Sequence, residues 1–395
     1  MNKKKLVSLL LALAMVFALG ACGGDTQGNQ ESQTPSTSSP SGENNASSGD
    51  AKVAVFYYNY ADTYIASVRT ALDAALDAAG VTYQDFDGNN NQTTQNEAID
   101  TALADNYNIL VVNMVTTGSS DTAKAILDKA AAKGAKVIFF NRAIEEDGAE
   151  GSVLGADTYK DMVSFVGTDA PEAGHLQGQM IGEYLLENYD TVDLNGDGVI
   201  SYAMFKGDEA NVEAIYRTQY GVEDANKVLT EAGKPELAYF DPASSSGYQV
   251  DMGGAWSSAA ALEYMTTNLA QYNETNGNMI ELVICNNDNM AEGAISALQA
   301  AGYNTGAEGS KTIPVFGVDA TDSAQALIAQ GVMTGTVKQD AEGMANAICE
   351  MVTSTAAGTS MADAAAAIAS SNEIYTVAEG IDNKLYVAYA PFTGK

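Results

Sequence analysis

The chain is 395 residues long and carries 51 Asp and Glu against 19 Lys and Arg, a formal net charge of −32 at pH 7. Its hydrophobic content of 46% excludes a chain that is disordered throughout, and its length is typical of two or perhaps three domains. The acidic charge argues against nucleic-acid binding, because a phosphate backbone is bound through basic patches.

The first 21 residues have the pattern of a bacterial lipoprotein signal peptide. Lysines at positions 3–5 precede an apolar run at 6–19, which is too short to cross a bilayer comfortably. The run ends in Leu-Gly-Ala-Cys, so cleavage before Cys22 would leave a lipid-modified N-terminal cysteine. Residues 22–50 are rich in Gly, Ser, Asn, Gln and Thr, which predicts a disordered tether. We therefore expect an extracytoplasmic domain that is lipid-anchored to the outer face of the cell membrane.

From residue 52 onward, segments typical of strands and helices alternate. Helical spacing of apolar residues at 62–79 ends at Gly80, a residue that commonly follows a helix, and a second helix is predicted at 122–133. Nearly continuous apolar runs, as expected for strands buried on both faces, predict strands at 53–58, 109–112, 137–140, 200–205, 282–284 and 315–318. Repeated strand–helix units predict an α/β protein of two doubly wound parallel-sheet domains.

Polar and aromatic side chains follow four of these strands, at the place where ligands bind in open α/β sheets. They are YNYADTY at 58–64, Asn141-Arg142, NND at 286–288 and Asp319. Each of these residues taken singly could be a helix cap, because Asp and Asn are favoured there. Together, carboxylates and amides can bond adjacent hydroxyls, while aromatic faces pack on the C–H groups of a sugar ring. The set therefore indicates a site for a neutral polyol.

Residues 193–201, DLNGDGVIS, match the first nine positions of an EF-hand loop. The oxygen donors stand at the expected places, namely Asp193, Asn195, Asp197, the carbonyl of Val199, and Ser201. Position 12 is a methionine instead of a bidentate Glu, so the last ligand must come from elsewhere in the fold. The alternative is an Asx-rich turn without metal. The pattern predicts a structural Ca²⁺ site.

These features together resemble the D-galactose/D-glucose-binding protein family, the substrate-binding components of methyl-galactoside ABC importers. The matching stretches include VIFFN at 137–141, VGTDAPEAG at 166–174, DLNGDG at 193–198, NNDNM at 286–290, IPVFGVDA at 313–320 and IDNK at 381–384. The resemblance implies two lobes joined by a three-strand hinge. It assigns residues 51–167 and 339–380 to the N-terminal lobe, and 168–338 and 381–395 to the C-terminal lobe. It also implies that Glu281 completes the calcium loop.

The resemblance implies a sugar site as well. Polar contacts carried over from the family are Asp62, Asn141, Arg217, Asn287 and Asp319, with the aromatic rings of Tyr64 and Trp256 on opposite faces of the sugar. Three further positions depart from the family, which has a His, an Asp and an Asn where this chain has Asn211, Glu213 and Gln339. Each replacement can still hydrogen-bond but changes the reach of the side chain. The choice among galactose, glucose and a related pentose therefore stays open.

We therefore expect a monomeric, lipid-anchored receptor, not an enzyme, that captures galactose or glucose between its lobes and delivers it to an ABC permease. A sensor that presents its closed form to a chemoreceptor or a sensor kinase is compatible with the same features. An extracellular glycoside hydrolase is an alternative, with Asp62 and Asp319 as acid and base about 5 to 10 Å apart. A sugar-responsive transcription regulator is disfavoured, because a signal peptide stands where such a regulator needs a helix-turn-helix.

Overall fold

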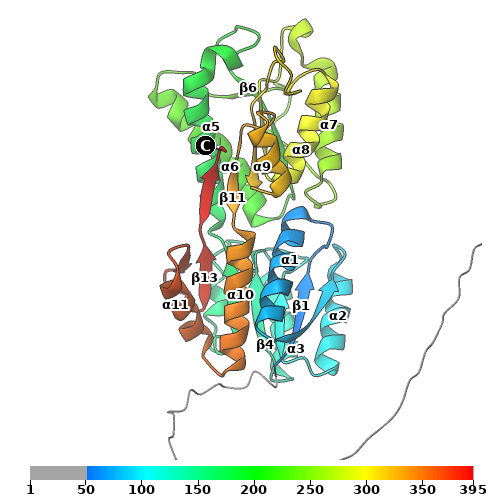
Figure 1. Ribbon diagram of the computed structural model, residues 1–395, viewed down its shortest axis with the longest axis vertical. Helices are drawn as coiled ribbons and strands as arrows, with labels where there is room; N and C mark the ends of the chain where they lie inside the picture. The colour runs from blue at the N-terminus through cyan, green and yellow to red at the C-terminus, as the bar shows by residue number, and fades with distance from the viewer. Residues whose placement is uncertain (1–50, 395) are drawn as a thin grey trace, which may run out of the picture. The chain divides into compact units, whose positions relative to one another are not determined.

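The computed structural model describes residues 51–394 and contains two seven-stranded sheets, each flanked by helices (Figure 1). The expected signal peptide, lipidated Cys22 and tether lie outside the described residues. Among residues 51–394, no helix combines the length and the apolar character that a bilayer crossing requires. The predicted α/β class with two lobes is confirmed.

The first lobe is built on a sheet that is parallel except at one edge. In spatial order its strands are β12 (Tyr375–Val377), β13 (Lys384–Val387), β5 (Val163–Gly167), β4 (Lys136–Phe140), β3 (Ile109–Val112), β1 (Lys52–Tyr57) and β2 (Thr82–Asp87). Only β12 runs antiparallel to its neighbour. Its helices are α1 (Thr63–Ala78), α2 (Gln92–Ala104), α3 (Ser120–Ala131), α4 (Gly151–Leu154), α10 (Ala341–Ala356) and α11 (Met361–Ser371).

The central strand β1 shows why the strands read as continuous apolar runs. Val53 and Val55 pack in a core with α1, α10 and α11, whereas Ala54 and Phe56 pack in a second core with α2 and α3. Because successive side chains of a strand point to opposite faces, a strand covered by helices on both faces needs apolar residues at every position.

The second lobe repeats this architecture. Its sheet has the order β14 (Tyr389–Phe392), β11 (Gly335–Gln339), β10 (Val315–Asp319), β9 (Leu282–Cys285), β6 (Ser201–Lys206) and β7 (Ala238–Tyr239), and β8 (Gln249–Val250) also pairs with β6. Only β14 runs antiparallel to its neighbour, β11. The helices are α5 (Ala170–Val192), α6 (Val212–Glu231), α7 (Ser258–Gln271), the short η1 (Glu274–Asn276), α8 (Asp288–Ala300) and α9 (Asp322–Ala329).

Helices α5 and α6 lie together on one face of the second sheet, packed unusually closely. Gly174 and Gly178 of α5 lie against the backbone of α6, where a Cβ at either position would clash with a carbonyl oxygen of Tyr216 or Tyr220. Gly182 meets Val228 one turn further along. The GxxxGxxxG spacing therefore serves helix packing in this chain, and it fixes the position of α6, which carries several residues of the site described below.

The chain crosses between the two sheets three times, between β5 and α5, between β11 and α10, and between β13 and β14. The expected lobe boundaries are wrong at two places. Gln339 ends β11 in the second sheet, and Lys384–Val387 pairs with β5 in the first sheet, so the last crossing lies at Ala388 and not at 380–381. The C-terminal apolar stretch is two strands of different sheets, and apolar character does not distinguish one long strand from two short ones.

Candidate functional site

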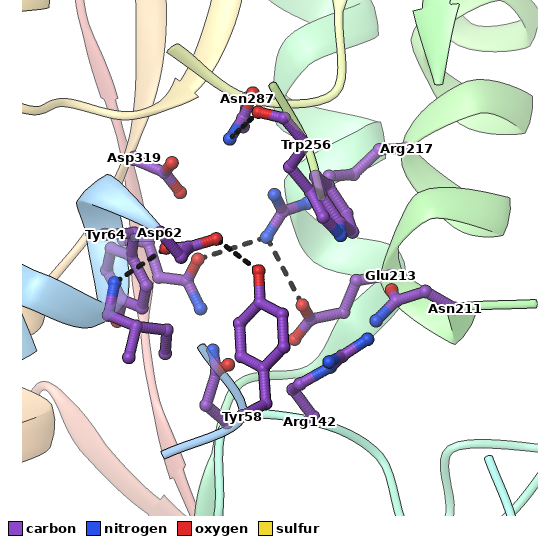
Figure 2. Close-up of a pocket in the computed structure, with 13 residues that line it drawn as sticks. Tyr58, Asp62, Tyr64, Arg142, Asn211, Glu213, Arg217, Trp256, Asn287 and Asp319 are labelled. Atoms are coloured by element: carbon purple, nitrogen blue, oxygen red, sulfur yellow. Dashed lines mark hydrogen bonds and ion pairs between the residues drawn. The ribbon is translucent and has the colours of Figure 1, made fainter. Parts of the chain in front are cut away.

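A pocket lies between residues of the two lobes (Figure 2). The pocket is lined by every residue expected to contact a sugar, namely Asp62, Tyr64, Asn141, Asn211, Glu213, Arg217, Trp256, Asn287, Asp319 and Gln339. Three further residues also line it, namely Tyr58, Ile65 and Arg142. Residues that are far apart in the sequence therefore converge on one pocket.

Three of the polar residues cap helices as well as lining the pocket. The Oδ1 atoms of Asp62, Asn211 and Asn287 accept backbone N–H groups in the first turns of α1, α6 and α8 at 2.8, 2.9 and 2.9 Å. Each residue stands where a strand leads into a helix, so the cap fixes the orientation of its side chain. The cap role that the sequence left open is therefore real, and it is compatible with the remaining polar atoms facing a ligand.

Asp319 is held at the end of β10 in a left-handed backbone conformation, with φ of 126°, and is 5% exposed. Among residues 51–394, no group donates a hydrogen bond to its carboxylate. Burial raises the pKa of the carboxyl well above its usual value, and the charge of Arg217 opposes that shift. A buried carboxylate without a donor from the protein is suited to accept a hydroxyl of a ligand.

Arg217 of α6 is buried and makes hydrogen bonds or ion pairs with several neighbouring residues. Its Nη1 donates to the carbonyl of Asn286 at 2.9 Å, and its Nη2 donates to Gln339 Oε1 at 3.1 Å and to the Tyr389 hydroxyl at 2.9 Å. The carboxylate of Glu213 lies 3.7 Å from Nη2. Burial raises the pKa of Glu213, and the nearby Arg217 charge opposes the shift.

Donor groups without partners gather in this pocket. Among the described residues, Arg142 Nη1, Arg217 Nε and Gln339 Nε2 are buried nitrogen atoms that have no hydrogen-bond acceptor in the protein. Buried polar groups are almost always paired, so unpaired donors at a cavity mark where acceptors of a ligand belong. Hydroxyl and ring oxygens of a polyol are acceptors of this kind.

The two predicted aromatic contacts, Tyr64 and Trp256, both line the pocket and are nearly buried. Trp256 has a left-handed backbone with φ of 54°, and its indole lies flat against Gly207, where any Cβ would clash with the ring. The Arg217 guanidinium lies 5.6 Å from the Trp256 ring centroid. Glycine at position 207 therefore allows the indole to reach the pocket.

The residue-by-residue comparison with the family missed Tyr58, Ile65 and Arg142. The Tyr58 hydroxyl donates to Asp62 Oδ2 at 2.6 Å, and the Arg142 guanidinium lies 4.0 Å from the centroid of the Tyr58 ring. A signal for two of them was present, because Tyr58 and Arg142 belong to the strand-end segments that the sequence singles out. Ile65 carries no such signal, since an apolar residue in the first turn of a helix usually belongs to the core.

The calcium loop has the right donor types but not a formed cage. Asp193 accepts the N–H groups of Gly196 and Gly198, while the Glu281 carboxylate accepts the N–H groups of Leu194, Asn195 and Ser201. Glu281 therefore lies at the loop, as the resemblance implied. Among residues 51–394, no group of three or more His, Cys, Asp or Glu side chains is arranged to hold a metal ion. The oxygen donors fit calcium chemically, yet the carboxylates are engaged by the backbone of the loop.

Comparisons with known proteins show the family of the chain. Residues 53–360 match the family model described as "Periplasmic binding protein domain". The chain is 30% identical over 312 residues to the D-galactose/methyl-galactoside binding periplasmic protein MglB of Haemophilus influenzae, covering 79% of this chain and 83% of that protein.

Solved structures share the fold. An ABC transporter solute-binding protein from Clostridium phytofermentans with bound β-D-glucose has a TM-score of 0.64 at 20% identity, covering 87% of this chain and 94% of that one. One from Bacillus halodurans with bound myo-inositol has a TM-score of 0.61 at 21% identity, covering 88% and 96%. By its sequence and its two-lobed architecture, the chain belongs to the periplasmic binding protein family, whose members are extracytoplasmic binding proteins and not enzymes.

Proposed function

We propose that this protein is the sugar-binding component of an ABC importer, which captures D-galactose or D-glucose and delivers it unchanged to a membrane permease. The observation that carries the proposal is the convergence of all the expected contacts on one small pocket with unpaired donors and a free carboxylate. The name of the Haemophilus relative, which states D-galactose and methyl-galactoside, supports the sugar class.

The pocket supports a neutral ligand better than an anionic one. Asp62, Glu213 and Asp319 all line it, against Arg142 and Arg217. Arg142 already pairs with Asp208, and Arg217 lies beside Glu213. An added carboxylate or phosphate would meet like charges in a buried site, which costs several kcal/mol. Uncharged hydroxyls can both accept from the arginines and donate to the carboxylates.

Ligand binding is expected to stabilise the closed arrangement of the lobes. Asp62 and Asn141 follow strands of the first sheet, whereas Asn287 and Asp319 follow strands of the second sheet. A sugar therefore contacts both sets of residues only when the lobes are together. This difference in contacts is what shifts the equilibrium toward the closed state, which a permease can recognise.

The preferred sugar is decided by residues that differ from the family. Asn211, Glu213 and Gln339 all line the pocket, so the departures fall where they can alter specificity. Glu213 and Gln339 both contact Arg217, so they also help to orient the guanidinium group of Arg217, which can donate hydrogen bonds to a ligand. We propose galactose or glucose first, with a related monosaccharide as the alternative.

Lipid attachment at Cys22 and a structural calcium ion in the 193–201 loop are part of the same proposal. The lipobox-like sequence supports the first, because it follows a basic and apolar segment. The oxygen donors of the loop and the adjacent Glu281 support the second. Mass spectrometry of the protein from its native membrane tests the lipid.

Isothermal titration calorimetry with a panel of sugars tests the proposal. The panel contains D-galactose, D-glucose, methyl β-D-galactoside, L-arabinose and myo-inositol, with D-galacturonate as the anionic control. We expect binding of one of the first two at micromolar or lower Kd, and none of galacturonate. Absence of heat with every aldohexose would reject the proposal, and turnover of a nitrophenyl galactoside would favour a hydrolase.

A further inference from the structure

The segment at 251–256, which ends at Trp256, receives a direct hydrogen bond from the first lobe. We propose that this segment and Asp208 form a latch, in which Asn90 and Arg142 of the first lobe hold the lobes closed. Asn90 and Asp208 then set the affinity for the ligand without touching it. The proposal rests on the proposed sugar-binding function.

The segment is a compact loop and not a flexible connection. The buried Asp251 carboxylate accepts the N–H of Gly253 at 2.9 Å and both the N–H and the hydroxyl of Ser257 at 2.9 and 2.7 Å. The N–H of Asp251 donates to the carbonyl of Lys206 in β6 at 2.9 Å. The loop is therefore fixed to the second sheet and closed on itself by hydrogen bonds. A displacement of Gly253 would consequently also displace Trp256.

The first contact of the latch is made by Asn90. Its Nδ2 donates to the carbonyl of Gly253 at 3.1 Å. The backbone N–H of Asn90 donates to the carbonyl of Tyr58 at 2.8 Å, which ties it to the strand-end segment that lines the pocket. Asn90 has φ of 52°, a left-handed conformation that asparagine tolerates better than most residues. Its side chain is thus presented to the opposite lobe from a fixed backbone.

The second contact is an ion pair between the lobes. Arg142 Nη2 lies 3.3 Å from Asp208 Oδ2, and Arg142 is 4% exposed. The Asp208 carboxylate also accepts the N–H of Ala210 at 3.0 Å and lies against Gly254 of the loop. A Cβ placed on Gly254, whose φ is 58°, would lie 3.4 Å from this carboxylate, so the loop passes close to the ion pair.

Neither Asn90 nor Asp208 lines the pocket. Both contacts join residues of different lobes, so they exist only while the lobes are closed. Contacts of this kind raise the fraction of closed protein, and the apparent Kd equals the intrinsic Kd divided by that fraction. Their loss should therefore weaken binding and speed release, although neither Asn90 nor Asp208 lines the pocket.

Fluorescence of Trp256, the only tryptophan of the chain, gives the readout. The full chain is titrated with D-galactose and with D-glucose, and the release rate is measured by stopped flow. Asn90→Ala and Asp208→Asn should each weaken binding about 2- to 10-fold and raise the release rate, as expected for the loss of one hydrogen bond or ion pair. Met252→Ala is the control in the same loop, since that side chain is 84% exposed.

Small-angle scattering of the ligand-free proteins separates a latch from a local fold defect. The variants should be more open than the wild type in the absence of sugar, and all should reach the same dimensions with sugar at saturation. Variants that match the wild type in Kd, release rate and ligand-free dimensions overturn the latch. Absence of binding by the wild type itself overturns the proposed function instead, while the scattering comparison still decides the latch.

Discussion

The guanidinium of Arg217 donates a 2.9 Å hydrogen bond to the hydroxyl of Tyr389. That hydroxyl also lies 3.0 Å from the hydroxyl of Thr168, and Arg217 donates to Gln339 as well. Thr168, Gln339 and Tyr389 each lie at one of the three crossings between the lobes. Arg217, a residue of the pocket, is therefore connected by hydrogen bonds to all three segments that join the lobes, directly at Gln339 and Tyr389 and through Tyr389 at Thr168.

The first prediction concerns this connection. Tyr389→Phe removes the hydroxyl and leaves the ring in place, so the fold should be retained while the Arg217 guanidinium loses an acceptor. We expect the Kd for the sugar to rise at least about 10-fold, the effect of one lost hydrogen bond to a charged group. Calorimetry measures it. Tyr159→Phe, which removes a surface hydroxyl bonded to Asp128, is the control and should bind like the wild type.

Asp319→Asn should change binding and stability in opposite directions. The substitution replaces a buried carboxyl group, which receives no hydrogen bond from the protein and whose pKa burial raises, by a neutral amide, so the melting temperature of the free protein should stay equal or rise. Sugar affinity should fall at least about 10-fold, because hydrogen bonds to charged groups are worth roughly 1.5 to 3 kcal/mol. Unchanged affinity would remove Asp319 from the site.

Asp62→Ala provides the comparison for Asp319. Asp62 caps α1 through Ile65, so its loss should cost about 1 kcal/mol of stability in addition to affinity. Thermal melts and calorimetry on both variants therefore distinguish a residue that serves the ligand alone from one that also serves the fold.

A pH dependence of stability should come from Asp85 of β2 and Asp73 of α1, two carboxyl groups whose charges act on each other. Burial, followed by the charge of Asp73, raises the pKa of Asp85 to about 7, and Arg69 opposes the shift. Since this value exceeds the ordinary 3.8, the folded protein holds a proton that the unfolded chain releases. This stabilisation is complete below about pH 3.8 and is lost as the pH rises through about 7.

Asp85→Asn tests this dependence, because an amide at position 85 can donate to Asp73 at every pH. The variant should be more stable than the wild type at pH 8, and the difference should shrink toward pH 5. Thermal melts from pH 5 to 8 measure it. Asp190→Asn on the exposed surface of α5 is the control. A stability difference that is independent of pH would contradict the raised pKa of Asp85.

Calcium should raise the melting temperature without being required for folding. Glu281 already accepts three backbone N–H groups of the 193–201 region, so the loop has a closed form that needs no ion. An ion that binds the native state at a free concentration of 100 times Kd adds about 2.7 kcal/mol. We expect a chelator to lower the melting temperature and calcium to restore it, with Glu281→Gln insensitive to both. Equal melts with chelator and calcium would assign the segment to an Asx turn.

Much of the fold could be read from local patterns. Alternating apolar runs and helical periodicity predict the two α/β lobes, since burial on both faces imposes apolar residues throughout a strand such as β1. Strand-end polar residues such as Asn141 and Asp319 were recognisable because open parallel sheets expose their sites at those ends. These inferences succeed because the relevant forces act between neighbours in the chain.

What could not be read are the pairings between distant residues. No sequence pattern near these residues indicates that Lys384–Val387 joins the first sheet while Tyr389–Phe392 joins the second. In the same way, the partners in the Arg217–Tyr389 and Asn90–Gly253 contacts are more than 160 residues apart. A hydrogen bond depends on the distance and angle between two groups, and for such pairs these are set by the packing of whole lobes.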